Sequence, residues 1–190
     1  MTLTEKIQKI PEIAVLLEML KLSQMDTYNH SISVSKITEK MLSFLPYPEE
    51  EKEEIIKGAL LHDIGKLFVP FNLTQLPRSL SLQEFSIIQI HAAVSYEITH
   101  SVFSKIVQDI CLFHHERPNG SGYSQKIMLC DIPEYALLVQ VADVYDALTE
   151  KRNYKQPYSS EKAIQIMKSD ASQFLLDDQF VNLLEKALEG

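Results

Sequence analysis

The residues of this 190-residue chain that could do chemistry are histidines and aspartates whose types and spacing suit metal binding. Two pairs are adjacent, in the segments HDIGK and HHERPNGSGY, and two further histidines and one aspartate stand alone in helical or apolar segments. Imidazole and carboxylate groups suit iron, manganese, zinc or nickel, and seven of them are too many for one ion. The sequence therefore predicts a site for at least two metal ions, and a hydrolase is the first hypothesis for the class of protein. The predicted ligands are His30, His62, Asp63, His91, His114, His115 and Asp143.

The spacing of the adjacent pairs restricts where they can lie. Neighbouring helical residues point about 100° apart, so a pair can converge on one centre only near the end of a helix. The first pair precedes Gly65, and the second precedes a loop that contains Pro118 and Gly120. Asp143 lies in the apolar run ALLVQVADVYDAL, where an unpartnered carboxylate would be costly. We expect it to be paired, metal-bound or protonated, with a hydrogen-bonded or capping aspartate as the alternative. His30 lies on the apolar face of its helix and is expected to point inward.

The elements that must position these residues are helical almost throughout. Apolar residues recur at helical spacing, and no long segment alternates as a half-buried strand does. A helix is expected to run from the acidic residues 49–54 to near Gly65, because acidic side chains favour the first turn. Ser81 and Glu84 have the spacing of a capping box for a helix that leads to His91. Further helices are expected near residues 11–24, 27–45, 92–101, 104–115, 132–149, 159–169 and 177–188.

This pattern predicts one all-α domain with the metal centre between its helices. Residues 1–22 are expected to form a helical extension packed on a catalytic domain of residues 23–190. The connections 67–80 and 116–127 hold proline, glycine and polar residues and are expected to be irregular. A loop as long as the second is often functional.

Composition excludes several classes of protein. The longest apolar runs are too short to span a bilayer, and the charged N-terminus is no secretory signal. A cytoplasmic protein without a membrane partner is therefore expected. The net charge of −8 argues against binding to a nucleic acid polymer, although bound cations would still attract a small anionic substrate. Cys111 and Cys130 belong to no CxxC motif, and we expect neither a disulfide nor a structural zinc site.

The motifs HDIGK, HHERPNGSGY and VADVYDALTEKRNY, with the isolated His91 between the first two, resemble in order and spacing those of the HD-GYP domain. This domain is a bacterial branch of the HD phosphohydrolase superfamily, and the resemblance runs from about Ser23 to Leu188. It implies a helical fold, two or three divalent metal ions, and hydrolysis of the second messenger cyclic di-GMP to pGpG or GMP. A hydroxide that bridges the metals would be the nucleophile. Iron or manganese is the first expectation, with zinc and nickel as alternatives.

The same resemblance implies roles for individual residues. All seven predicted ligands would bind metal, Asp63 would bridge two ions, and Lys66 would hold a phosphate oxygen, so that both act in catalysis. Substrate contacts are also implied for Gly122, Tyr123, Arg152 and Lys155. Asp26 stands where some family members have a glutamate that binds a third metal; the alternative is that Asp26 caps a helix starting at Thr27. His100 fits no motif and is predicted to make no metal contact.

Four positions depart from the family pattern without removing a predicted ligand. They are Asn119 for an aspartate, Ser124 for the proline of GYP, Asn153 for a proline and Leu76 for a lysine. These departures put the substrate fit in question, so hydrolysis of another cyclic dinucleotide or nucleotide phosphoester is an alternative. A metal-containing module that binds nucleotide, or docks a regulatory protein through residues 116–127, is another. An iron- or oxygen-sensing di-iron protein is a weaker alternative, because it leaves Lys66 without a role.

Overall fold

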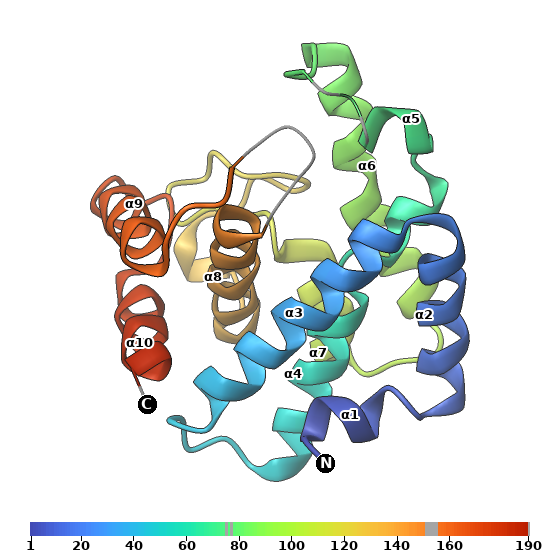
Figure 1. Cartoon of the computed structure of the whole chain (residues 1–190), viewed down its shortest axis with the longest axis horizontal. Helices are drawn as coiled ribbons and strands as arrows, with labels where there is room; N and C mark the ends of the chain where they lie inside the picture. Colours follow the sequence, from blue (N-terminus) through green and yellow to red (C-terminus); the bar gives the residue numbers. More distant parts are fainter. Residues whose placement is uncertain (75, 77, 151–155, 190) are drawn as a thin grey trace.

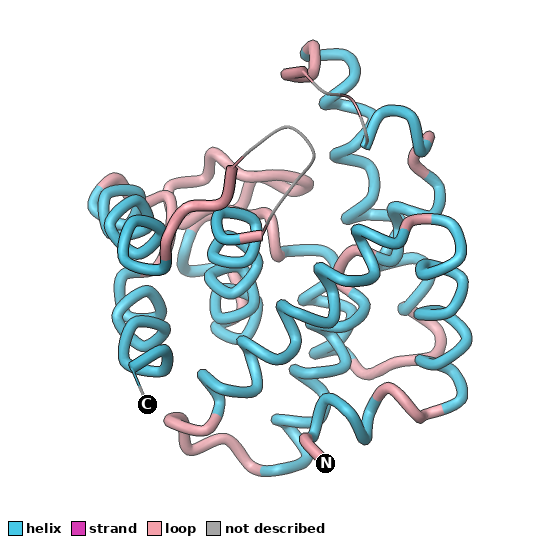
Figure 2. Tube along the Cα trace, viewed as in Figure 1, coloured by secondary structure: helices cyan, strands magenta, loops and turns pink. Residues whose placement is uncertain are grey.

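Helices and short 3-10 turns make up the regular structure of the residues that the computed structural model describes, which are 1–74, 76, 78–150 and 156–189. No strand occurs in these ranges (Figure 2), so the all-α prediction is confirmed. In chain order the elements are α1 (Leu3–Ile7), α2 (Pro11–Ser23), α3 (Met25–Leu42), α4 (Glu49–Leu61), η1 (Ile64–Phe68), α5 (Phe71–Thr74), α6 (Leu82–Thr99), α7 (Lys105–Phe113), η2 (Leu129–Asp131), α8 (Glu134–Thr149), α9 (Ser160–Ser172) and α10 (Asp178–Glu189).

The centre of the molecule is formed by α3, α4, α7 and α8. Helix α3 packs against α4 and α8, and α4 packs against α7 (Figure 1). Helix α8 is buried without a break from Ala136 to Asp143, because it also contacts α9 and α10. Each fully buried aliphatic side chain in such a core stabilises the fold by about 1.5–3 kcal/mol. The core therefore fixes the helix ends that carry the predicted ligands.

The first two helices are tied to this core. Glu39 of α3 accepts hydrogen bonds from the backbone N–H groups of Leu3 and Thr4 at 2.6 and 3.1 Å. Partial burial would raise the pKa of Glu39, but the hydrogen bonds from Thr4 and Leu3 lower it below its ordinary value of 4.5. Ile13 and Leu17 of α2 belong to the same apolar core as α3 and α4. The division of the chain at residue 22 stays a prediction.

Helix α6 differs from the two helices expected in its region. It runs without interruption over residues 82–99 and begins with the predicted capping box of Ser81 and Glu84. In the first half of α6 the apolar residues Leu82 and Ile90 are exposed. The helix therefore lacks a continuous buried apolar face from which its full length could be predicted. The irregular connection expected before it, residues 67–80, contains the end of η1 and the short helix α5.

The ends of two other helices also differ from expectation. Helix α4 ends at Leu61 rather than near Gly65, because residues 64–68 tighten into η1. A Cβ atom at Gly65 would overlap the backbone carbonyl of His91, so glycine lets η1 lie directly against α6. Helix α3 begins at Met25 and holds Asp26 within its first turn, so the alternative in which Asp26 caps the helix is wrong.

Two expectations from composition can be compared with the structure. No helix in the described part of the chain combines the length and apolar character needed to cross a membrane. Cys111 is buried, Cys130 is exposed, and both are free thiols, as predicted.

Candidate metal centre

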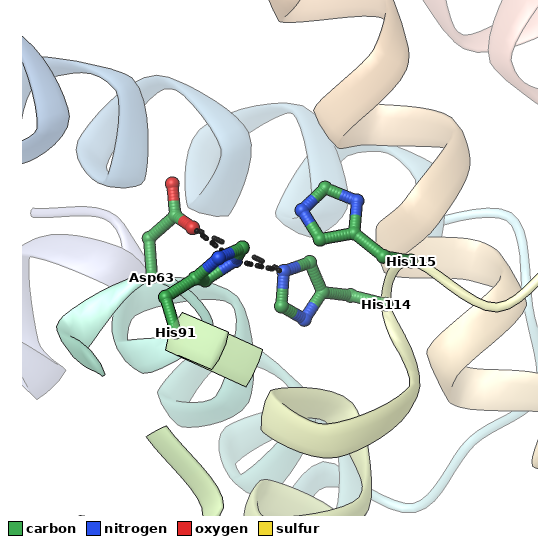
Figure 3. A group of neighbouring side chains, drawn as sticks. All are labelled: Asp63, His91, His114 and His115. Carbon is green, nitrogen blue, oxygen red and sulfur yellow. Dashed lines mark hydrogen bonds and ion pairs between the residues drawn. The ribbon is translucent and has the colours of Figure 1, made fainter. Parts of the chain in front are cut away.

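The seven predicted ligands come from five parts of the fold. They are His30 of α3, His62 and Asp63 between α4 and η1, His91 of α6, His114 and His115 after α7, and Asp143 of α8. Six of them form two groups in which one potential ligand atom of each residue lies within 4.8 Å of the others. The first group is Asp63, His91, His114 and His115 (Figure 3), and the second is His30, His62 and Asp63. The carboxylate of Asp63 belongs to both.

Asp63 presents each of its oxygens to a different pair of imidazoles. Its Oδ1 lies 3.1 Å from His91 Nε2 (Figure 3) and 3.9 Å from His114 Nε2. Its Oδ2 lies 3.4 Å from His62 Nε2 and 3.8 Å from His30 Nε2. This is the arrangement expected of a carboxylate that bridges two cations.

Three of the imidazoles are held in place by a hydrogen bond from Nδ1, the ring nitrogen that faces away from Asp63. His62, His91 and His114 each donate Nδ1–H to the backbone carbonyl three residues earlier, at 2.8, 2.6 and 3.0 Å. A carbonyl oxygen can only accept, so each ring carries a proton on Nδ1 and turns Nε2 toward Asp63. Histidines that ligate metals are usually oriented by such a bond on the opposite nitrogen.

This orientation turns several buried nitrogen and oxygen atoms toward one place, where a cation would satisfy them. The Nε2 atoms of His91 and His114 lie 3.3 Å apart. His62 Nε2 and Asp63 Oδ1 are buried and have no hydrogen-bond partner among the described residues. A buried polar group left unsatisfied costs about 1–3 kcal/mol. The donor set is that of divalent transition metals, so the residues present fit such ions.

His30 is held between two carboxylates of α8. Its Nδ1 lies 2.6 Å from Asp146 Oδ2, and its Nε2 lies 2.9 Å from Asp143 Oδ1. Burial alone would lower the pKa of His30, but the hydrogen bonds with Asp143 and Asp146 raise it to about 9. The other oxygen of Asp146 accepts from the Ser33 hydroxyl. Asp146 thus orients His30, and it forms a further group of potential ligands with His30 and Glu150.

Asp143 lies beside the two groups rather than in either of them. Besides its contact with His30, its Oδ2 lies 3.9 Å from His115 Nδ1. Burial would raise the pKa of Asp143, but the hydrogen bond and charge of His30 lower it well below the ordinary range. Asp143 is therefore an anion in an apolar helix and is paired with His30, which is one of the three states expected from the sequence; its role as a metal ligand stays a prediction.

The protonation states of the other ligands suit metal binding. Burial would raise the pKa of Asp63, but the neighbouring Lys66 and His62 lower it well below the ordinary range. Burial lowers the pKa of His114, and it lowers the pKa of His115 to about 3. Asp63 is therefore an anion, and His114 and His115 are neutral imidazoles with lone pairs available.

The other predicted site residues lie around this cluster or outside the described chain. Lys66 of η1 places Nζ 2.5 Å from Asp63 Oδ2 and is partly exposed. Asp26 is exposed and belongs to none of the ligand groups, and its third-metal role stays a prediction. His100 is exposed at the end of α6 and lies outside those groups too. Two further predicted substrate residues, Arg152 and Lys155, lie outside the described residues.

Glu116 shapes the loop after α7, although the sequence gave no reason to single it out. Its fully buried carboxylate accepts hydrogen bonds from the backbone N–H groups of Gln125, Lys126 and Ile127 at 2.5, 3.0 and 3.2 Å. A Cβ atom at Gly122 would overlap the backbone of Glu116. The predicted irregular segment 116–127 is thus held in one shape by a buried carboxylate.

This loop places Tyr123 against the cluster. The backbone N–H of Tyr123 donates to the carbonyl of His115 at 3.1 Å, and the two rings lie 4.6 Å apart between centroids, tilted by 32°. Phe85 of α6 meets the Tyr123 ring edge-on, with centroids 5.9 Å apart. Burial raises the pKa of the Tyr123 phenol above its ordinary range, so this side chain is neutral.

Two of the departures from the family pattern lie in the same loop. Asn119 Oδ1 accepts from the backbone N–H of Ser121 at 3.0 Å and from its hydroxyl at 2.7 Å. An aspartate oxygen would accept both bonds, so this departure preserves the turn. The Ser124 hydroxyl is buried without a partner in the described chain. Asn153 lies outside the described residues.

An all-helical fold with a carboxylate shared between two groups of histidines defines a helical metal-binding domain. The chain belongs to the HD domain family, whose profile matches residues 14–180. The resemblance to HD-GYP proteins is confirmed by this match together with the relatives described next.

The curated relatives are longer proteins. A cyclic di-GMP phosphodiesterase from Thermotoga maritima is 34% identical over 162 residues, which cover 83% of this chain and 44% of that protein. The 3'3'-cGAMP-specific phosphodiesterase 2 from Vibrio cholerae is 33% identical over 140 residues, which cover 72% of this chain and 27% of that protein. The chain thus spans less than half the length of either relative.

Among solved structures, an HDG"Y"P protein from Bdellovibrio bacteriovorus superposes with a TM-score of 0.71 at 24% identity, covering 85% of this chain and 52% of that one. The two proteins share the fold.

Proposed function

We propose that this chain is a metal-dependent phosphodiesterase that hydrolyses cyclic dinucleotides, with cyclic di-GMP as the first expected substrate. The position of Asp63 carries the proposal, because its two oxygens face two different groups of histidine Nε2 atoms. Relatives named as cyclic di-GMP and 3'3'-cGAMP-specific phosphodiesterases support the substrate class. Iron or manganese is the first expected metal, with two ions per chain and a third only if Asp26 takes part.

The ligand groups suggest how two ions would be held. One would lie in the group drawn in Figure 3, and the other between His30 and His62, with Asp63 common to both. The contact of Asp143 with His30 supports Asp143 as a further ligand of the second ion. When bound, such a metal pair lowers the pKa of a water molecule toward neutrality and polarises the phosphoryl oxygens.

Among the residues that the structure describes, Lys66 is a cation in direct contact with the cluster. Its ammonium group is partly exposed beside Asp63, so it can contact a phosphate oxygen at the cluster. A compact cation there would oppose the negative charge that develops on a phosphodiester during hydrolysis. The substrate contacts predicted for Gly122, Tyr123, Arg152 and Lys155 remain predictions beside this role.

The test combines metal content with turnover in one sample. The protein would be purified without oxygen, its iron, manganese, zinc and nickel counted per chain, and the same sample incubated with cyclic di-GMP. Two or three ions per chain and formation of pGpG or GMP are expected. The variant Asp63→Ala should lose both metal and activity. A fully loaded wild-type chain that left every cyclic dinucleotide intact would overturn the proposal.

A different cyclic dinucleotide is the second candidate substrate. The Vibrio cholerae relative is named for 3'3'-cGAMP, and Ser124, whose hydroxyl has no partner among the described residues, lies where the family has a proline. A panel of cyclic di-GMP, 3'3'-cGAMP and cyclic di-AMP, compared by kcat/KM, separates the two candidates. Docking of a regulatory protein on residues 116–127 stays a prediction.

A further inference from the structure

A pocket of about 170 Å³ opens directly beside the metal cluster. His114 and His115 line it, and it extends between the first half of α6 and the loop after α7. Pockets that enclose a whole drug-sized ligand usually measure about 300–1,000 Å³. This pocket therefore has room for one part of a dinucleotide, and that part would be adjacent to whatever the cluster binds.

Two aromatic side chains line this pocket. Phe85 reaches it from the first turn of α6, and Tyr123 reaches it from the loop, where its ring also packs against His115. Phe85 is 42% exposed even though it is large and apolar. Aromatic faces stack with nucleobases without regard to base identity, so these two rings suit a flat heterocycle.

A buried glutamine forms part of the pocket wall. Gln140 is 2% exposed and donates its Nε2 to the backbone carbonyls of His114 and Glu116. These bonds fix the orientation of the amide, and Gln140 Oε1 is left buried with no partner in the described chain. The Gln140 side chain is therefore a fixed part of the wall beside His114.

Donors line the same pocket. Arg117 gives one guanidinium N–H to the carbonyl of Leu175 at 3.0 Å and has four others. The amide of Gln89 lines the pocket from α6, one turn beyond Phe85. Several donors in one small pocket match the acceptor atoms on the edge of a purine, such as N7 and O6 of guanine.

We propose that this pocket binds one purine base of a nucleotide whose phosphate lies at the metal cluster, with Phe85 stacking on the base and Gln89 binding its edge. The proposal rests on the proposed function, since it takes the ligand of the cluster to be a nucleotide. His114 and His115 belong both to the cluster and to the pocket wall, so a phosphate and its own base would occupy neighbouring places.

The experiment measures binding rather than hydrolysis. Manganese-loaded protein would be titrated calorimetrically with 5′-GMP and with ribose 5-phosphate, which has the same phosphate and sugar but no base. Base stacking on protein aromatics corresponds to an affinity gain of about 5- to 150-fold. The wild-type protein should therefore prefer 5′-GMP by a factor in this range.

The variants locate the preference within the pocket. Phe85→Ala should reduce the preference for 5′-GMP at least about fivefold while leaving ribose 5-phosphate binding unchanged, and Gln89→Leu should reduce it with little change in side-chain size. Phe44→Ala is the matched control, because Phe44 is 41% exposed but lies just after α3, beside Lys186 of α10. It should leave both affinities unchanged.

The outcomes separate this pocket from the proposed reaction. Equal affinity for 5′-GMP and ribose 5-phosphate, or a preference that survives in Phe85→Ala and Gln89→Leu, would overturn the base site even if cyclic di-GMP is hydrolysed. A preference lost in both variants would support the base site even if no cyclic dinucleotide is hydrolysed, and the proposed function alone would then fail.

Discussion

Replacement of Asp146 tests the metal centre without removing a predicted ligand. Its Oδ2 lies 2.6 Å from His30 Nδ1, and its other oxygen accepts from Ser33. The variant Asp146→Asn keeps an oxygen that can accept from the imidazole but removes the negative charge. The variant Asp146→Ala leaves a buried Nδ1 without a partner. The two variants therefore separate the effect of charge from the effect of orientation.

The expected losses follow from what each variant leaves around His30. Partners that orient a metal-binding histidine usually contribute about 10- to 100-fold to metal affinity. We expect about 10-fold for Asp146→Asn and about 100-fold for Asp146→Ala, because the alanine variant no longer fixes the proton on Nδ1. These factors correspond to about 1.4 and 2.7 kcal/mol of binding free energy.

The assay is a titration of metal-free protein with manganese in competition with a chelating indicator. Circular dichroism of the same samples shows whether the helices are retained. Ser33→Ala is the control, since it removes the second contact of Asp146 and leaves the bond to His30; its affinity should stay close to that of the wild type. Wild-type affinity in a folded Asp146→Ala variant would refute the reasoning that this carboxylate prepares His30 for metal binding.

Three further predictions concern other parts of the site and fold. Lys66→Ala should retain the metal ions and lower kcat by about 10²- to 10³-fold; metal analysis beside turnover checks this, and unchanged turnover would contradict the phosphate role. Gly122→Ala should destabilise the protein by about 1–3 kcal/mol and raise KM, because the new Cβ overlaps the Glu116 backbone; unchanged urea unfolding and KM would disprove it. Glu39→Gln should lower the free energy of unfolding at pH 7 by about 1 kcal/mol. This is less than a buried charged hydrogen bond contributes, because solvent screens the partly exposed carboxylate. Since the folded-state pKa of Glu39 lies below 4.5, its contribution is complete above that pH and is lost as the pH falls through the lower value. Urea titrations at about pH 7 and about pH 3 should therefore show a smaller difference from wild type in acid, and an equal loss at both would count against the charged hydrogen bonds.

Much of the candidate site could be predicted because metal chemistry restricts the residue types. Few side chains can ligate a transition metal, so adjacent His-Asp and His-His pairs are conspicuous in any sequence. The constraint that both pairs lie at helix ends also agrees with the structure, where His62 follows the last residue of α4 and His114 follows the last residue of α7. The helical period was sufficient to predict the all-α fold.

The residues that support the site could not be predicted, because their partners have no sequence signature. Asp146 binds a histidine 116 positions earlier, and Glu116 binds backbone N–H groups that every residue but proline possesses. Gln140 likewise donates to two backbone carbonyls. The continuity of α6 is hard to predict for a related reason, since part of its apolar surface is exposed rather than packed in the core.

The ligands come from separate helices between His30 and Asp143, which has a consequence for how the protein matures. No local segment of the chain brings both groups together, so the centre is complete only after distant helices have closed around α8. The site that holds the ions is therefore a property of the folded chain, and ions that bind it stabilise the native state. A core substitution far from the cluster that lowers the folded fraction will lower the apparent metal affinity by the same factor. Loss of metal in a variant is thus informative about the site only when folding has been measured beside it.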